Sequence, residues 1–409
     1  MSLNSTPSAD RLHIGLFGKR NAGKSSVINA VTNQEIAIVS DIKGTTTDPV
    51  YKAMELLPIG PVMIIDTPGL DDEGELGARR IEKTHQVLNK TDLAVLVIDC
   101  TIGMTDMEQQ LIKLFKEKTI PYVIVYNKFD LFKEQFPEKA ATVNPTNNEV
   151  YVSAQTGENI EALKNMLPLF VPDDESDLRI IGDMLAPGDV VVLVVPIDSA
   201  APKGRLILPQ QQTIRDIMDA GAIAVVTKDT ELRQTLASLS KKPRMVITDS
   251  QVFAKVSADT PDDIPLTSFS ILFGRYKGNM VDLIAGVNAV NKLKDNDKIL
   301  ISEGCTHHRQ CEDIGTVKIP RWLKQHTGKN LQIVTSSGTS FPRDLSDYAL
   351  VVHCGGCVLN RREMQHRIQL VKQHNVPIVN YGILISYLQG ILHRSVQPFP
   401  ELASLIEEK

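Results

Sequence analysis

Runs of consecutive apolar residues recur through the first part of the chain, and a short polar stretch follows each of them. Such runs, rich in valine, isoleucine and leucine, are typical of strands that are covered on both faces of a sheet. The runs lie at residues 12–17, 63–65, 93–99, 122–126 and 149–152. A helix-forming run at 26–31 comes after the first polar stretch. This order predicts an α/β domain.

Strands and helices continue to alternate beyond an acidic, proline-led stretch at 172–177, which marks the clearest domain boundary. The second part has predicted strands at 190–196, 223–227 and 244–248 with helical patterns between them, as in a βαβ unit of parallel strands. The third part repeats this arrangement. Its predicted strands lie at 298–302, 331–335 and 347–352, and its predicted helices at 318–326, 361–374 and 383–393. We therefore predict an α/β chain with domains at 1–172, 173–262 and 263–409.

Composition narrows the classes of protein to which the chain can belong. Of its 409 residues, 42% are hydrophobic and 23% are charged, and no apolar run is long enough to span a membrane. The net charge of −5 offers no general attraction to nucleic acid or to anionic lipid. The first ten residues lack the order of a signal peptide, and the five cysteines do not form a disulfide framework. We expect a cytoplasmic protein that binds neither nucleic acid nor membranes.

A phosphate-binding loop follows the first predicted strand. Residues 18–25 have the pattern G-x-x-x-x-G-K-S between a strand and a helix, which is the context that such a loop requires. Its backbone N–H groups cradle phosphates, Lys24 neutralises the β- and γ-phosphate oxygens, and Ser25 is a Mg²⁺ ligand. The expected nucleotide contacts in the loop are Gly18, Asn21, Ala22, Gly23, Lys24, Ser25 and Ser26.

Three further motifs identify the base and the γ-phosphate end of the nucleotide. A strand ends in D-x-x-G, where Asp66 would hold Mg²⁺ through water and the Gly69 N–H would contact the γ-phosphate. The carboxylate of Asp130 can accept hydrogen bonds from guanine N1–H and N2–H₂, a pair of donors that adenine lacks. The remaining expected contacts are Asn127, Lys128, Ser153 and Ala154, with the Ala154 N–H directed at guanine O6. In this order the motifs predict GTP binding, and they resemble the boxes of Ras-like P-loop GTPases.

The segment 41–48 resembles the first switch of the TrmE–Era branch of these GTPases. The resemblance assigns Thr46 to Mg²⁺ and the γ-phosphate, so that Lys24, Thr46 and Gly69 are the expected catalytic groups. Ser25, Thr46 and Asp66 form the expected Mg²⁺ site. Asn21 matches the asparagine with which relatives bind K⁺ in place of an arginine finger, although an amide that caps the loop is the alternative.

Three cysteines in the third part of the chain form a candidate metal site. Cys305 follows one predicted strand, and Cys354 and Cys357 follow another in a Cys-x-x-Cys pair. Because the carboxyl ends of parallel strands converge at one edge of a sheet, the three thiols are expected together. Structural zinc and a [4Fe–4S] cluster both remain open on spacing alone. The candidates for a fourth ligand are His307, His308, Glu312 and His353.

The spacing C-x-H followed by H-C-x-x-C resembles the signature of the [FeFe]-hydrogenase maturation GTPases of the HydF family, and the resemblance covers the whole chain. It implies a homodimer that dimerises through the middle domain and carries a [4Fe–4S] cluster on Cys305, Cys354 and Cys357. It further implies a scaffold that receives a di-iron precursor of the H-cluster from two radical-SAM maturases and delivers it to apo-[FeFe]-hydrogenase. The alternative is a ribosome- or tRNA-associated TrmE–Era-type GTPase with structural zinc, against which the acidic charge weighs.

Overall fold

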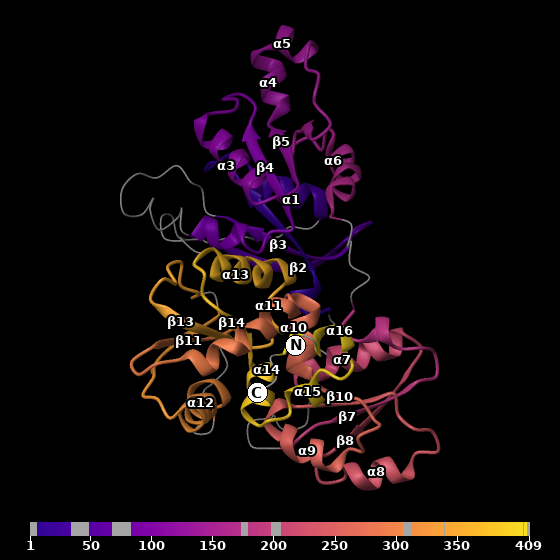
Figure 1. Ribbon diagram of the computed structural model, residues 1–409. Coiled ribbons are helices and arrows are strands. Elements are labelled where there is room, and N and C mark those ends of the chain that lie inside the picture. The colour runs from indigo at the N-terminus through magenta and orange to yellow at the C-terminus, as the bar shows by residue number, and fades with distance from the viewer. Residues whose placement is uncertain are drawn as a thin grey trace. The chain divides into compact units, whose positions relative to one another are not determined.

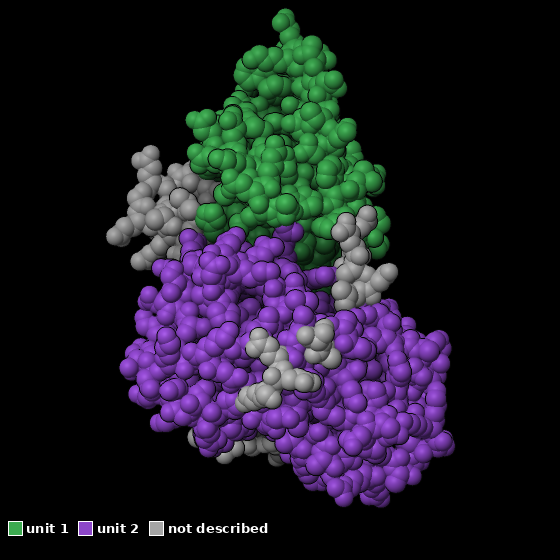
Figure 2. Space-filling view, viewed as in Figure 1, with its two compact units in different colours: residues 1–175 green, residues 176–409 purple. Residues whose placement is uncertain are grey.

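The computed structural model describes residues 6–33, 49–67, 83–172, 179–197, 206–305, 313–338, 340–403 and 405–406. The chain divides into two compact units, Met1–Glu175 (unit 1) and Ser176–Lys409 (unit 2), which Figure 2 shows in different colours. In the described residues, no helix combines the length and the apolar character that crossing a membrane requires.

Unit 1 is built on a six-stranded sheet with the order β2-β3-β1-β4-β5-β6. Figure 1 labels β2, β3, β4 and β5 of this sheet. The strands are β1 Leu12–Phe17, β2 Val50–Leu56, β3 Gly60–Asp66, β4 Leu93–Asp99, β5 Tyr122–Asn127 and β6 Glu149–Tyr151. All neighbours are parallel except β2 and β3, which are antiparallel. The helices are α1 Lys24–Thr32, α3 Asp106–Glu117, α4 Phe129–Gln135, α5 Pro137–Ala141 and α6 Ile160–Met166, with 3-10 turns at Ser8–Asp10 and Leu167–Phe170.

Two apolar clusters cover the sheet of unit 1, because successive side chains of a strand point to opposite faces. Leu16 belongs to the cluster that contains Val27 of α1. The next residue, Phe17, belongs to the cluster that contains Phe115 of α3. The apolar run at 12–17 is therefore a strand that is buried on both faces, as predicted.

The first sheet of unit 2 has four parallel strands in the order β10-β9-β7-β8. They are β7 Val190–Val194, β8 Ile223–Thr227, β9 Met245–Thr248 and β10 Leu266–Ser268, joined by α7 Leu208–Asp219, α8 Leu232–Ser238 and α9 Phe253–Asp259, with 3-10 turns at Gly182–Met184 and Ser250–Val252. The predicted parallel βαβ unit is confirmed. The strand β10 lies beyond residue 262, where the sequence suggests that the second domain ends, and it pairs with β9. The other edge is β8.

The second sheet of unit 2 is also parallel and has the order β12-β11-β13-β14. Its strands are β11 Lys298–Glu303, β12 Gln332–Ser337, β13 Tyr348–His353 and β14 Ile378–Asn380. The helices are α10 Phe269–Lys277, α11 Met280–Ala285, α12 Ile319–Thr327, α13 Arg361–Gln373, α14 Tyr381–Leu388, α15 Leu392–Ser395 and α16 Pro400–Ala403, with a 3-10 helix at Gly286–Lys292 and a π-helix at Ile314–Lys318.

One continuous apolar core joins the two sheets of unit 2, and it extends from Ile180 to Leu402. The helix α10 packs against α7 beside the first sheet and against α13 and α14 beside the second. A side chain on α10 can therefore contact elements of both sheets.

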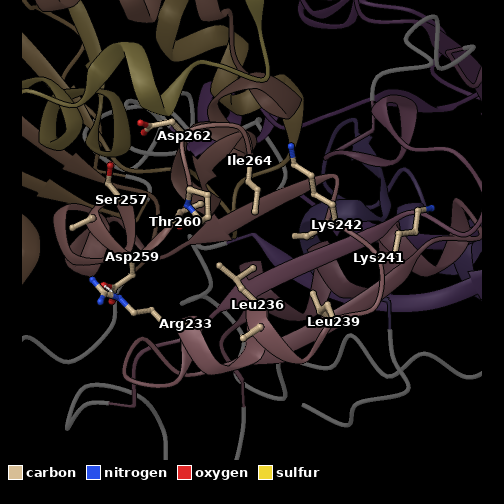
Figure 3. A pocket seen from close by; sticks show the side chains of 14 residues that line it. Arg233, Leu236, Leu239, Lys241, Lys242, Ser257, Asp259, Thr260, Asp262 and Ile264 are labelled. Carbon is tan, nitrogen blue, oxygen red and sulfur yellow. Dashed lines mark hydrogen bonds and ion pairs between the residues drawn. The ribbon is translucent and has the colours of Figure 1, made fainter.

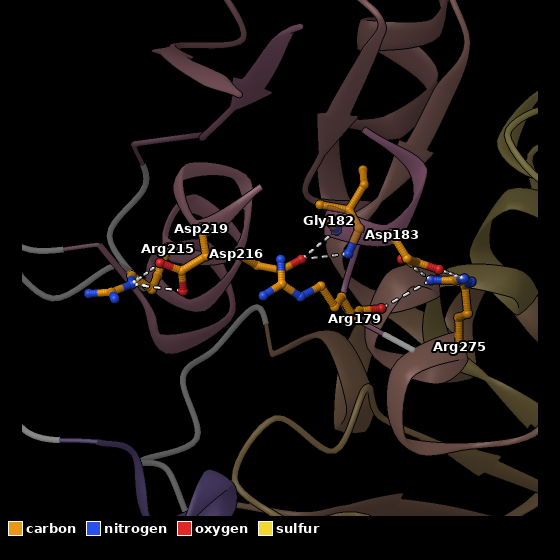
Figure 4. Close-up of polar contacts among 8 residues, drawn as sticks. Arg179, Gly182, Asp183, Arg215, Asp216, Asp219 and Arg275 are labelled. Atoms are coloured by element: carbon orange, nitrogen blue, oxygen red, sulfur yellow. Dashed lines mark hydrogen bonds and ion pairs between the residues drawn. The ribbon is translucent and has the colours of Figure 1, made fainter. Parts of the chain in front are cut away.

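The beginning of the described part of unit 2 is held by two charged side chains (Figure 4). The carboxylate of Asp216 on α7 accepts hydrogen bonds from the N–H groups of Ile181, at 2.8 Å, and Gly182, at 2.7 Å. The guanidinium of Arg275 on α10 pairs with the carboxylate of Asp183. The segment 181–183 is thus attached to α7 and to α10.

Candidate nucleotide site and candidate metal centre

The phosphate-binding loop has the shape that its motif predicts. Gly18 and Gly23 adopt φ of +138° and +89°, and a Cβ atom at Gly18 would lie 2.2 Å from the carbonyl oxygen of Val97. Lys24 is 8% exposed, and its ammonium donates to the carbonyl oxygens of Gly18 and Lys19, each at 2.9 Å. The lysine is therefore held across the mouth of the loop, where phosphate oxygens would replace carbonyls as its acceptors.

Asp66 and Ser25 lie together at the edge of this loop. The Ser25 hydroxyl donates to Asp66 Oδ2 at 3.3 Å. Asp66 Oδ1 is buried and has no hydrogen-bond partner in the described part of the chain. Burial raises the pKa of Asp66, whereas Lys24 and Ser25 oppose that rise. A buried carboxylate oxygen without a partner, next to a hydroxyl, fits the oxygen ligands that Mg²⁺ prefers. Thr46 and Gly69 fall outside the described residues.

Asn127 connects the phosphate-binding loop to the segment that follows β6. Its side chain is 3% exposed. Its Nδ2 donates to the carbonyl oxygen of Ala22 at 3.0 Å, and its Oδ1 accepts from the N–H of Ala154 at 3.1 Å. The N–H that the sequence assigns to guanine O6 thus bonds to Asn127 in this structure. Ser153, also predicted as a contact, is buried and accepts through its hydroxyl oxygen from the N–H of Thr156.

The base-recognition residues after β5 lie at the same edge of the sheet. Lys128 adopts the left-handed conformation with φ of +64°, and its ammonium pairs with Asp99 Oδ2 at 2.5 Å. The carboxylate of Asp130 is half-buried in the first turn of α4, and no group in the described part of the chain donates a hydrogen bond to it. It can therefore accept hydrogen bonds from a guanine ring.

Asp99, which pairs with the predicted nucleotide contact Lys128, was not predicted from the sequence as part of this site. It also accepts hydrogen bonds from the N–H and the hydroxyl of Thr101, at 3.0 and 2.6 Å. Burial raises its pKa, but the hydrogen bonds from Lys128 and Thr101 outweigh that effect, so the pKa lies below its ordinary value. Its position at the carboxyl end of β4, beside the other motif residues, was the available signal.

The three expected cysteine ligands lie at one edge of the second sheet of unit 2. The strands β11 and β13 are neighbours, with Ser302 opposite His353. The Cys354 N–H donates to the carbonyl oxygen of Ser302 at 2.9 Å. The Sγ atom of Cys354 in turn accepts from the N–H groups of Gly304, at 3.1 Å, and Gly356, at 3.4 Å.

Cys357 interacts electrostatically with both other thiols. Burial raises its pKa to about 12, Cys354 and Cys305 add to the rise, and Lys277 opposes it. All three cysteines are half-buried and free of disulfides. Thiols at adjacent strand ends with N–H donors to sulfur have the donor chemistry of an iron–sulfur site. No group of three or more metal-binding side chains is assembled among the residues described, and His307, His308 and Glu312 lie outside them.

His353, a candidate fourth ligand, has both ring nitrogens in hydrogen bonds within the fold. Its Nδ1 lies 2.8 Å from the carbonyl oxygen of Cys354, and its Nε2 lies 3.1 Å from Nη1 of Arg367. Burial, with the nearby Arg367 charge, lowers its pKa to about 3, so the ring is neutral. The N–H therefore points to the carbonyl and Nε2 accepts from arginine. In this arrangement the imidazole is not directed at the thiols.

Arg367 was not anticipated from the sequence. It lies on α13, is 1% exposed, and pairs with Glu363 at 3.0 Å one helical turn earlier. It also donates to the carbonyl oxygen of Gly338 at 2.6 Å. Together with its contact to His353, this network fixes the strand end that carries Cys354.

A groove of about 880 Å³ lies beside the first sheet of unit 2 (Figure 3). Its cationic side chains are paired: Arg233 with Asp259, Lys242 with Asp263, and Lys241 with Asp189, at 2.6, 2.6 and 3.5 Å. The groove therefore lacks the free converging charges of a binding site for a small anion.

Comparison with known proteins gives matches to both units. A family model described as "50S ribosome-binding GTPase" matches residues 13–128. GTPase Der of Wolinella succinogenes is 33% identical over 165 residues, 38% of this chain and 35% of that protein. The tRNA modification GTPase MnmE of Carboxydothermus hydrogenoformans is 35% identical over 166 residues, 40% of this chain and 35% of that protein. The chain spans about a third of the length of these curated relatives.

A solved structure of Aquifex aeolicus Era covers 53% of this chain and 92% of its own, with 19% identity and a TM-score of 0.32. Two further family models match unit 2. The "Hydrogen maturase F dimerization domain" matches residues 180–278, and the "Hydrogen maturase F tetramerization domain" matches residues 281–398. Because these two models together match more than half of the chain, which also carries a GTPase domain, the protein belongs to the hydrogenase maturase F (HydF) family.

Proposed function

We propose that this protein is a GTPase and an iron–sulfur scaffold, which accepts a di-iron precursor and transfers it to apo-[FeFe]-hydrogenase during H-cluster maturation. The observation that carries the proposal is the placement of Cys305 and the Cys354–Cys357 pair at adjacent strand ends, in a chain whose other unit has a phosphate-binding loop. Residues 180–278 and 281–398 match hydrogenase maturase F domains, so a ribosome- or tRNA-associated GTPase with structural zinc is not favoured.

In the proposed GTPase reaction, the chain supplies positioning and charge rather than a covalent intermediate. Lys24 would exchange the carbonyls of Gly18 and Lys19 for β- and γ-phosphate oxygens. Ser25 would ligate Mg²⁺, and the free oxygen of Asp66 would hold it through a water molecule. Thr46 and Gly69 would contact the γ-phosphate, and Asn21, which is exposed with φ of +62°, would bind K⁺.

In the proposed cluster site, Cys305, Cys354 and Cys357 would each hold one iron of a [4Fe–4S] cluster. The N–H groups of Gly304 and Gly356 would stabilise the negative charge on the Cys354 sulfur. The fourth iron would be left to a replaceable ligand from His307, His308 or Glu312, since His353 is engaged elsewhere. When bound, such a cluster supplies an exchangeable iron position at which the di-iron cargo can dock.

The two proposed sites belong to different units, so we assign GTP the role of a switch that controls partner binding or release. The partners would be two radical-SAM maturases and the apo-hydrogenase. The chain would form a homodimer through the edge strand β8, where Ile223 and Val226 are 52% and 45% exposed. An apolar edge strand of this kind is a template for pairing with a second strand.

The proposal is tested by anaerobic purification, followed by iron and acid-labile sulfide analysis and EPR of the reduced protein. About four irons and four sulfides per chain, with a reduced-cluster signal, are expected. Stoichiometric zinc without sulfide would contradict the scaffold role and restore the GTPase with structural zinc. A parallel assay of GTP hydrolysis tests the other half of the proposal.

A further inference from the structure

A buried lysine lies beneath the turn that carries the cysteine pair. Lys277 is the last residue of α10 and is 1% exposed, although it is about eighty residues from this turn in the sequence. Burying an ammonium is costly unless each of its protons finds an acceptor. A lysine in this position therefore requires a specific explanation.

Three acceptors of Lys277 come from the cysteine loop, which we define as residues 354–359. Its Nζ atom donates to the carbonyl oxygens of Cys357, at 3.0 Å, Leu359, at 2.7 Å, and Gly356, at 3.4 Å. Three carbonyl acceptors match the three protons of an ammonium, whereas a neutral amine would supply only two. The rings of Phe273 and Tyr276 lie 5.5 and 6.0 Å from the same nitrogen, which further favours the charged form.

Another residue of α10, Phe273, also packs against the cysteine loop. A Cβ atom at Gly355 would lie 3.4 Å from Cβ of Phe273, one helical turn before Lys277. Gly356 adopts φ of +65°, so the loop turns sharply at this point. The carbonyl oxygen of Lys277 itself accepts from Gln365 Nε2 on α13 at 3.0 Å. The loop, α10 and α13 are thus tied together at one residue.

We propose that Lys277 is a positioning residue for the cysteine loop, holding its carbonyls on one side so that Cys354 and Cys357 present their sulfurs together. Its ammonium also lies close enough to act electrostatically on Cys357, whose sulfur would be a thiolate in the cluster. This inference rests on the proposed cluster function. Net charge and hydrogen bonding near a cluster set its reduction potential, and a nearby cation favours the reduced, more negative state. Lys277, which positions the cysteine loop, therefore also raises the reduction potential of the cluster that the loop would bind.

The test uses the full-length chain with Lys277→Met, which keeps an unbranched side chain but removes the charge and all three donors. The matched control is Lys372→Met, because Lys372 is half-exposed on the same domain and pairs with Asp282 at 3.0 Å. In the cluster-free protein, Co²⁺ is titrated and its thiolate absorption band is followed. Lys277→Met is expected to weaken Co²⁺ binding at least about tenfold, and the control to leave it unchanged.

The second readout is the reduction potential of the reconstituted cluster, followed by EPR. Lys277→Met is expected to destabilise the reduced state about tenfold, a drop of about 59 mV for a one-electron couple. A variant with wild-type Co²⁺ affinity and wild-type potential would overturn the proposal. A wild-type chain that binds Co²⁺ but assembles no cluster would contradict the scaffold function, while the Co²⁺ comparison still decides the positioning role.

A second variant, Lys277→Gln, retains two hydrogen-bond donors without the charge and distinguishes a folding defect from a specific effect of Lys277. Circular dichroism and thermal melting identify the variants that are folded. For Lys277→Gln, Co²⁺ affinity between those of the wild type and Lys277→Met, together with the full drop in potential, would support both parts of the proposal. A potential equal to that of the wild type would refute the electrostatic part.

Discussion

Replacing Asn127 with aspartate exchanges a hydrogen-bond donor for an acceptor at the junction between the phosphate-binding loop and the guanine-recognition strand. In the native protein, Asn127 Nδ2 donates to the carbonyl oxygen of Ala22 at 3.0 Å. The new oxygen would face that carbonyl, and both groups are buried. A Cβ atom at Gly23 would lie only 2.2 Å from Nδ2, so the Asn127 amide packs directly against the backbone of Gly23.

The expected cost follows from these contacts. Loss of one neutral hydrogen bond costs about 0.5–1.5 kcal/mol, and a buried carbonyl left without a donor costs about 1–3 kcal/mol. In the free protein the phosphate-binding loop can relax, but nucleotide binding requires the native shape of the loop. The free-energy cost of the substitution therefore mainly lowers nucleotide affinity. A total of about 1.5–4.5 kcal/mol corresponds to a loss of about 10- to 2000-fold in GTP affinity.

The assay is a titration of Asn127→Asp with fluorescently labelled GTP and GDP. The matched control is Asn159→Asp, because Asn159 is exposed and donates to the carbonyl oxygen of Tyr151 at 2.8 Å. Water can replace that bond, so the control is expected to bind nucleotide within about twofold of the wild type. If Asn127→Asp also binds GTP within about threefold of the wild type, the contact between Asn127 and the loop does not support nucleotide binding.

Three further predictions concern the separate sites. Lys24→Ala is expected to lower GTP hydrolysis at least about 100-fold in a phosphate-release assay with iron content unchanged, and equal loss of both would contradict separable units. Cys354→Ser is expected to remove the cluster signal and the iron while GTPase activity stays within about twofold; an unchanged iron spectrum would exclude this ligand. Val226→Lys on β8 is expected to convert dimers into monomers in light scattering, whereas Met218→Lys on α7, also exposed, should not; a dimeric Val226→Lys would place the interface elsewhere.

Short-range information in the sequence predicted much of the fold. Apolar runs predicted β1, β4 and β5 because a strand that is covered on both faces is apolar at nearly every position. The antiparallel strand β2 was not predicted, because one of its faces is largely exposed and its pattern is weak. The three-residue strands β10 and β14 were missed since their place in a sheet depends on neighbours distant in the chain.

The nucleotide motifs and the cysteine pair could be recognised in the sequence because each is a short run of residues that are close together in the chain. The sequence also predicted that Cys305 lies near Cys354, because parallel strands bring their carboxyl ends to one edge. Only the tertiary structure placed Lys277 beneath the cysteine loop and directed His353 toward Arg367. These contacts join residues on different elements, and a lysine or an arginine on a helix has the same local pattern whether it faces solvent or a buried carbonyl. Burial, which makes these charges consequential, is a property of the packed fold alone.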